Sequence, residues 1–172
     1  MKWFIKCLKH YTNFSGRARR KEYWWFMVFN TLFSAILFTC WFVPVSMMIV
    51  AESGEPVLDE MAVITAAAKN PFLYIYIIYY IAMIIPCLAV TVRRLHDIGK
   101  SGYWCFFVVG GSIIGNIGNL FSKTNTVIYM LFLFIALAMT IVSLVWMFTG
   151  SDYGPNQYGP NPKGEGNPEE QE

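Results

Sequence analysis

Charged residues are scarce in this chain of 172 residues, and they are missing altogether from four long stretches. Only 14% of the residues are Asp, Glu, Lys or Arg, whereas a soluble domain carries about a quarter. The uncharged runs cover residues 23–51, 70–92, 101–122 and 124–151. Each is long enough to cross a hydrocarbon core of ~30 Å, which takes about 20 helical residues. A soluble domain is therefore excluded.

Residues that carry catalytic or metal chemistry are also few. The chain has four cysteines and two histidines, with no CxxC motif or Cys/His cluster, so we expect no disulfide framework and no metal site. Cys40, Cys87 and Cys105 lie within the apolar runs, where cysteine most often behaves as a small apolar residue. We expect no cofactor and no nucleic-acid partner. The first apolar run is too long for a cleavable leader and indicates a retained anchor.

The fold that follows is an all-α integral membrane bundle of four transmembrane helices. We place the transmembrane domain at 23–150, with spans at about 24–50, 70–92, 103–121 and 126–149. With the N-terminus inside, eleven of the 13 Lys and Arg residues fall on the cytoplasmic side. Because basic residues are retained in the cytoplasm, both termini are expected there.

The two flanking segments differ in character. Residues 1–22 form a basic cytoplasmic segment that begins with an expected amphipathic helix, which would lie in the lipid headgroup region or pack against the ends of the spans. Its apolar face comprises Trp3, Phe4, Cys7, Leu8 and Tyr11, and its basic face Lys2, Lys6 and Lys9. Residues 151–172 form a tail rich in Gly, Pro and Asn, with Tyr-Gly-Pro-Asn at 153–156 and again at 158–161. Each copy favours a turn, and we expect the last dozen residues to be disordered.

Two polar stretches, 14–25 and 93–104, fall at the cytoplasmic ends of the runs. Each combines arginines, one acidic residue, a Ser-Gly or Gly-Lys-Ser-Gly step and a Tyr-Trp pair. They are either topology anchors at the lipid interface or parts of a specific site. The candidate lipid- or partner-binding residues are Arg17, Arg19, Arg20, Glu22, Arg93, Arg94, His96, Asp97, Lys100 and Ser101.

If the two stretches form one site, a carboxylate should bridge them. We expect Glu22 or Asp97 to pair with an arginine of the opposite stretch, because a partly desolvated arginine fork stabilises a carboxylate most. Arg93 and Asp97 also stand four residues apart and can pair along one helix. A phosphate-bearing headgroup would then meet the remaining donors of Arg17, Arg93 and Arg94. Gly99 suits a helix C-terminus and Ser101 a helix N-terminus.

The third apolar run contains an unusual series of small and polar residues. Gly111, Gly115 and Gly118 form one helical stripe, and Ser112, Asn116 and Asn119 form the stripe beside it. Small residues let helix backbones approach closely, and Asn amides bond between helices. The pattern predicts helix packing through Gly111, Gly115, Gly118, Asn116 and Asn119. The alternatives are a polar seam along a solute path and a re-entrant segment.

Three segments together resemble a bacterial inner-membrane family called domain of unknown function 805. They are FSGRARRKEYW at 14–24, RRLHDIGKSG at 93–102 and GPNQYGPNP at 154–162. The resemblance runs from Tyr11 to Pro162. It implies a helical protein of the bacterial inner membrane, and it implies no activity.

Three classes of function compete. A scaffold or regulatory protein would bind anionic phospholipid or a protein partner, including another copy of the chain, through its basic cytoplasmic face, and it needs only the features above. A small transporter or channel component would use the Gly/Asn-lined third span, but no Asp, Glu, Lys, Arg or His lies at the centre of a span. An enzyme acting on lipid headgroups would need convergent acids, bases or metal ligands, and none is recognised. We therefore rank these functions in that order and expect no enzyme.

Overall fold

The computed structural model describes residues 2–53 and 60–167, and within these ranges the secondary structure is helical with no strand. The helices in chain order are α1 (Lys2–Lys9), α2 (Arg20–Ser53), α3 (Glu60–Lys69), α4 (Pro71–Asp97), the short 3₁₀ helix η1 (Gly102–Trp104), α5 (Cys105–Asn119) and α6 (Thr126–Phe148). Residues 54–59, between α2 and α3, lie outside the described residues.

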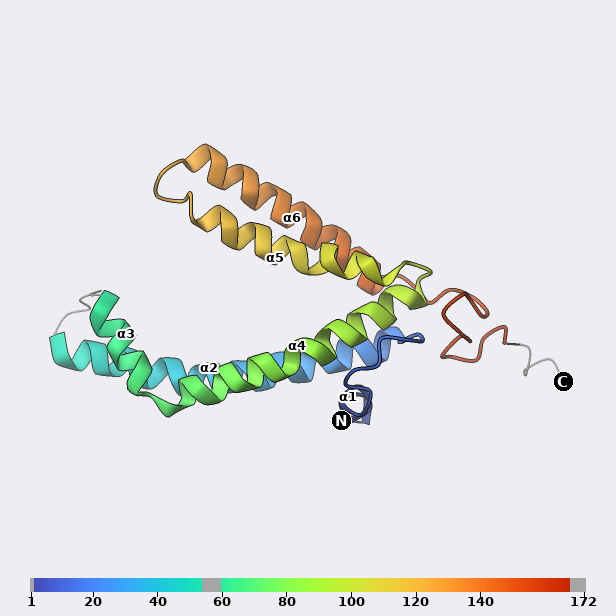
Figure 1. Ribbon diagram of the computed structural model, residues 1–172, viewed down its shortest axis with the longest axis horizontal. Coiled ribbons are helices and arrows are strands. Elements are labelled where there is room, and N and C mark those ends of the chain that lie inside the picture. The colour runs from blue at the N-terminus through green and yellow to red at the C-terminus, as the bar shows by residue number, and fades with distance from the viewer. Residues whose placement is uncertain (1, 54–59, 168–172) are drawn as a thin grey trace.

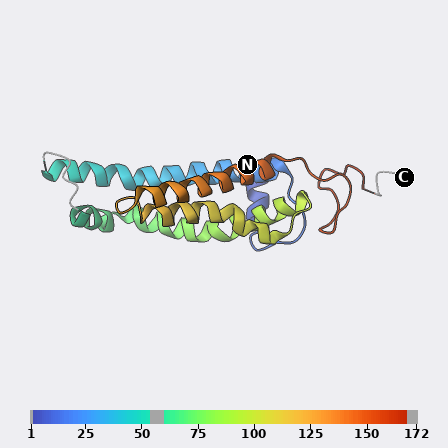
Figure 2. The same cartoon turned by 90° about the horizontal axis from the view of Figure 1, so that it is seen from above.

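The helices form two antiparallel hairpins that meet at one end and diverge at the other (Figure 1). One hairpin is α2 and α4, and the second is α5 and α6. The meeting point is the end of α4, where α1, the start of α2 and the C-terminal tail also lie. Seen from above, the two hairpins run along the same direction (Figure 2). This end of the molecule therefore collects segments that are far apart in the sequence.

Within the described residues, three helical segments are long and apolar enough to cross a membrane: Arg20–Met47, Pro71–Asp97 and Thr126–Phe148. They coincide with three of the four expected spans. The run expected as the third span, 103–121, instead folds as η1 followed by α5, which has 15 residues. At 1.5 Å per residue α5 is about 22 Å long, shorter than the ~30 Å of a hydrocarbon core.

Asparagine side chains explain where α4 and α6 begin, and a glycine explains where α4 ends. The Asn70 side chain accepts a hydrogen bond from Phe72 N, with Pro71 at the first helical position. Asn125 accepts in the same way from Val127 N and Ile128 N at the start of α6. Gly99, with φ of 70°, ends α4, because this left-handed conformation is rarely adopted by other residues.

The α5–α6 hairpin is closely packed along the glycine stripe. Gly111 and Gly118 are buried. A Cβ atom at Gly118 would lie 2.6 Å from Phe132 Cβ, and one at Gly111 would lie 3.3 Å from the Ala136 carbonyl oxygen. Gly115 is less tightly placed, since a Cβ there would meet Ala136 Cβ at an ordinary 3.5 Å. The two backbones thus approach at a distance that only glycine permits at Gly118.

Candidate functional site

The two polar stretches lie against each other where the hairpins meet. Because α2 and α4 are antiparallel, the start of α2 and the end of α4 share one end of the bundle. Ahead of α2, the Ala18 amide donates a hydrogen bond of 2.9 Å to the carbonyl oxygen of Arg93. The backbone itself therefore joins the two stretches. Between them lie the five charged side chains that we call the ion-pair cluster: Arg17, Glu22, Arg93, Arg94 and Asp97.

Asp97 is the centre of this cluster and is fully buried. Its Oδ1 accepts from Arg17 Nε at 3.2 Å, and its Oδ2 pairs with Arg94 Nη1. Ser151, in the tail, donates to the same Oδ2 at 2.6 Å. The Asp97 carboxylate therefore binds the loop before α2, the end of α4 and the C-terminal tail together.

Glu22 forms the second half of the cluster and is also fully buried. Its Oε1 accepts from Arg93 Nη1 at 3.0 Å, and its Oε2 accepts from Lys6 Nζ at 2.8 Å. Cys7 Sγ lies 3.7 Å from Oε1. Burial, followed by the nearby Glu22 charge, raises the pKa of the Cys7 thiol to about 12. Glu22 thus joins helix α1 to α2 and α4.

The two stretches are bridged by carboxylate–arginine pairs, as predicted, but not all the individual partners are the predicted ones. Each carboxylate pairs with an arginine of the opposite stretch, Glu22 with Arg93 and Asp97 with Arg17. The expected Arg93–Asp97 pair along α4 is wrong. Asp97 pairs instead with Arg94, three residues before it, because Arg93 is turned toward Glu22.

The C-terminal tail supplies acceptors that residue types did not indicate. Arg17 Nη1 donates to the Gly154 carbonyl at 2.7 Å, and Arg17 Nη2 donates to the Asp152 carbonyl at 2.8 Å. Arg94 Nη2 donates to the Thr149 carbonyl. The first Tyr-Gly-Pro-Asn copy contains a bend at 153–154, and turns follow at 157–158, 162–163 and 165–166. Asn161 is 2% exposed and donates to the Asp152 carbonyl. The disorder expected in the last dozen residues stays a prediction.

His96 joins the same three segments from the side. Its ring stacks on Tyr158 of the tail, with centroids 3.8 Å apart and planes 4° from parallel. Its Nδ1 donates to the carbonyl of Gly16 at 3.2 Å. Gly16 has φ of 84°, which explains the glycine in the Ser-Gly-Arg step. His96 is thus a structural contact between stretches and tail.

The remaining candidates lie outside the cluster. The Arg19 guanidinium lies 4.7 Å from the Trp3 ring centroid, and Lys100 Nζ lies 4.6 Å from that of Trp146. Ser101 accepts a weak hydrogen bond of 3.4 Å from Tyr103 N at the start of η1. The expected headgroup contacts Arg17, Arg93 and Arg94 are each less than 9% exposed, and each donates to a protein acceptor, although Arg93 Nη2 has no hydrogen-bond partner among the described residues. The outward cations are therefore different residues from the buried ones.

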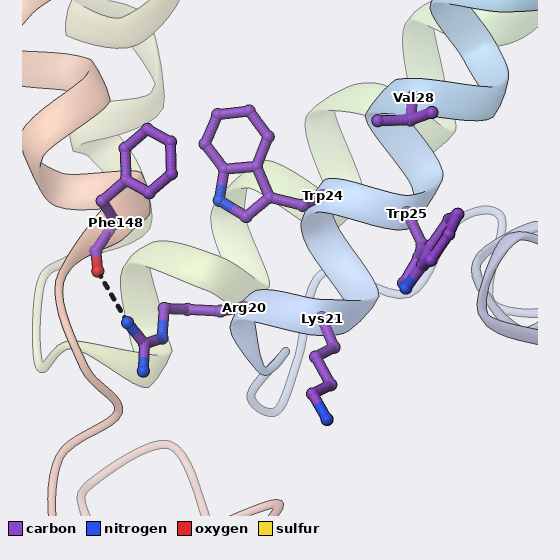
Figure 3. A pocket seen from close by; sticks show the side chains of 6 residues that line it. All are labelled: Arg20, Lys21, Trp24, Trp25, Val28 and Phe148. Atoms are coloured by element: carbon purple, nitrogen blue, oxygen red, sulfur yellow. Dashed lines mark hydrogen bonds between the residues drawn. The ribbon is translucent and has the colours of Figure 1, made fainter.

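Two of these outward cations border an apolar groove between α2 and the end of α6 (Figure 3). We call it the Trp24 groove; it has a volume of about 470 Å³ and is lined by Arg20, Lys21, Trp24, Trp25, Val28 and Phe148. Trp24 stacks on Phe148 with ring centroids 4.4 Å apart. Arg20 Nη1 donates to the Phe148 carbonyl at 3.1 Å. Both basic side chains leave the helix at the same end of the groove (Figure 3).

The polar stripe of α5 faces away from α6. Ser112, Asn116 and Asn119 are exposed, while the glycines beside them contact α6. Ser112 and Asn116 bond within their own helix, Ser112 Oγ to the Val109 carbonyl and Asn116 Nδ2 to the Ser112 carbonyl. No hydrogen bond from these amides to another helix is seen in the described part of the chain.

Comparison with known proteins gives a family and two relatives. The family described as "Protein of unknown function (DUF805)" matches residues 11–160 of this chain. Inner membrane protein YhaI of Escherichia coli (strain K12) is 29% identical over 163 residues, which is 95% of this chain and 97% of the relative. Inner membrane protein YhaH of the same strain is 36% identical over 104 residues, 60% of this chain and 69% of the relative. No solved structure matches the chain.

Proposed function

This chain belongs to the DUF805 family, and we propose that it is a membrane scaffold that binds anionic phospholipid through its basic cytoplasmic face. The supporting observation is the division of the basic residues into two groups. Arg17, Arg93 and Arg94 are buried in the ion-pair cluster, where they hold the segments together. Arg19, Arg20, Lys21 and Lys100 lie outside it, at the same end of the molecule, beside tryptophan side chains.

The energetics favour a lipid surface as the partner of the outward cations. Each basic residue near an anionic leaflet contributes about 1 kcal/mol, so the four outward cations together would contribute roughly 4 kcal/mol at low salt. Tryptophan is enriched at the same depth, because its ring is apolar and its N–H is polar. The buried carboxylates do not cancel this charge, since each is already paired with an arginine.

The topology in this proposal has both termini in the cytoplasm and four passes. Contacts between Arg17, which precedes α2, and the carbonyls of Asp152 and Gly154, which follow α6, support termini on the same side. The positive-inside count assigns that side to the cytoplasm. In this topology the short helix α5 crosses the membrane together with its flanking turn, or the bilayer around it is locally thinner. A reporter fused after Gly150 should be active only as a cytoplasmic fusion, and one inserted near Glu52 only as a periplasmic fusion.

Helix α1 would lie at the membrane surface in this arrangement. It is anchored to α2 by the Phe4–Phe26 ring contact at 5.4 Å and by the Lys6–Glu22 ion pair. Its Ile5 side chain is 48% exposed. An exposed apolar residue beside lysines is what a helix in the headgroup region presents.

The proposal is tested by lipid binding to the purified chain. Vesicles or nanodiscs containing phosphatidylglycerol should bind or stabilise the chain more than those containing phosphatidylcholine alone, and added salt should weaken the difference. Replacing Arg19, Arg20, Lys21 and Lys100 by Gln should remove the preference. The control variant replaces Lys69 and Lys123, the two basic residues assigned to the periplasmic side, and should keep the preference for phosphatidylglycerol. Equal binding of both lipids would reject the proposal, and a single protein captured by crosslinking from 98–102 would replace it with a protein partner.

A solute path is the second candidate function, favoured by one cavity between the hairpins. The cavity has a volume of about 220 Å³, and Asn30, Ser34 and Cys87 line it together with Val109 of α5. Asn30 accepts from the Tyr79 hydroxyl at 2.9 Å within it. If water enters this cavity, a membrane-impermeant thiol reagent should label Cys87 in intact membranes. Labelling only after unfolding would exclude the path.

A further inference from the structure

We propose that the Trp24 groove holds one anionic glycerophospholipid molecule, with its phosphate at Arg20 and Lys21 and one acyl chain along α2. This inference rests on the proposed function and assigns it a single site in place of a diffuse charged surface.

The phosphate end is defined by two cations that still have donors to give. Arg20 donates one N–H to the Phe148 carbonyl at 3.1 Å, and its side chain is exposed, so its other N–H groups can reach a ligand. Lys21 is exposed, and it has no ion-pair or hydrogen-bond partner among residues 2–53 and 60–167. An arginine fork matches two phosphate oxygens, and a lysine adds a point charge. No acidic residue lines the groove.

The acyl-chain end is an apolar track that continues along the same helix. A second cavity of about 430 Å³ shares Trp24 and Val28 with the groove and extends past Leu32 to Ala35. Val28 and Leu32 are each more than half exposed. From Trp24 to Ala35 the helix advances about 16 Å, which matches the ~15 Å half-thickness of a hydrocarbon core. A chain lying on this track would therefore reach the bilayer midplane.

The other basic residues at this end do not offer an equivalent site. Arg19 and Lys100 lie against the rings of Trp3 and Trp146, outside the Trp24 groove, and the arginines of the ion-pair cluster are buried. Arg20 and Lys21, by contrast, combine open donors with an adjoining apolar groove. Because Phe148 is the last residue of α6, a lipid bound here contacts both hairpins at their junction.

The test is native mass spectrometry of the full chain in detergent, titrated with phosphatidylglycerol. We expect one tightly bound lipid on the unaltered chain. Removing both cations, Arg20→Gln with Lys21→Gln, should weaken its apparent affinity by roughly 30-fold, as expected for the loss of two interfacial charges. Val28→Trp keeps every charge but fills the groove, and it should remove the tight lipid. The matched controls are Lys100→Gln, a cation outside the groove, and Val43→Trp, a valine at the far end of α2 that is 39% exposed.

The outcomes separate this inference from the proposed function. If Lys100→Gln weakens binding as much as the double change at Arg20 and Lys21, or if Val28→Trp keeps the tight lipid, the groove is not the site, although the basic face still binds lipid. If phosphatidylcholine binds as tightly as phosphatidylglycerol, both proposals fail. Inorganic phosphate serves as the probe for the headgroup chemistry alone. If millimolar inorganic phosphate displaces the lipid, the acyl track contributes nothing to the affinity, and the inference would be rejected.

Discussion

Replacing Asp97 by Asn tests whether the ion-pair cluster holds this molecule together. The change keeps the size of the side chain but removes the negative charge. Arg17 and Arg94 would then lose their common counter-ion, although their side chains are only 1% and 0% exposed. The two cations would be left buried beside each other.

The expected cost is large for a single substitution. Removing one partner of a buried ion pair costs about 3–5 kcal/mol, and the asparagine oxygen can still accept from one donor, so we expect about 3 kcal/mol. This corresponds to roughly a 150-fold change in the unfolding equilibrium. Because whole domains are stable by only about 5–15 kcal/mol, the folded yield in detergent should fall visibly.

The assay is equilibrium unfolding in mixed micelles, followed by circular dichroism. Asp152→Asn is the matched control, because this neighbouring carboxylate is partly exposed and its one side-chain hydrogen bond among the described residues is a 3.5 Å contact from Asn156. This change should alter stability by less than about 0.5 kcal/mol. Arg17→Gln should cost less in the Asp97→Asn chain than alone, since it then removes an unpaired cation. Equal and small effects of Asp97→Asn and Asp152→Asn would refute the argument.

Three further predictions follow from buried positions. Gly118→Ala should lower the free energy of unfolding in detergent by the cost of an overpacked contact, about 1–3 kcal/mol, and so lower the melting temperature. Gly150→Ala, with nothing within 4 Å of the added carbon, should change neither. Cys7, whose pKa is raised from 9.0 to about 12, should resist alkylation at pH 8 until the chain unfolds. Since the unfolded thiol loses its proton first, the stability of the fold should also fall between about pH 9 and pH 12. Tyr158→Ala removes the stack on His96 and should speed hydrogen exchange at the Asp152 amide, which donates to the Asp97 carbonyl at 2.9 Å; unchanged exchange would mean that the stack does not hold the tail.

The three long helices were predictable because an uncharged run of more than 20 residues has few physical explanations other than a membrane span. The length of α5 was not predictable in the same way. Residues 101–122 are uncharged throughout, yet the helix ends at Asn119 and is followed by turns up to the Asn125 cap of α6. Hydropathy shows that a stretch is apolar enough to lie in a membrane, but it does not show at which residue the helical hydrogen bonding ends.

The pairing of the two stretches was predictable from charge, but the individual partners were not. Both Arg93 and Arg94 lie within one turn of Asp97, and the rotation of α4 against α2 decides which of them meets it. No sequence pattern indicated that the tail contacts the ion-pair cluster. Arg17 binds it through backbone carbonyls, which every residue carries, so residue types cannot reveal the contact.

The contact of the tail with Arg17 and Asp97 also has a consequence for biogenesis. Residues 151–167 are synthesised after the segments that carry Arg17 and Asp97, so these two side chains are made before their partners in the tail. Until the tail docks, Arg17 lacks its bonds to Asp152 and Gly154, and Asp97 lacks Ser151. A chain truncated after Phe148 would keep the described helices α1 to α6 but would leave Arg17 and Asp97 without these partners. The tail therefore completes the hydrogen bonding of the ion-pair cluster.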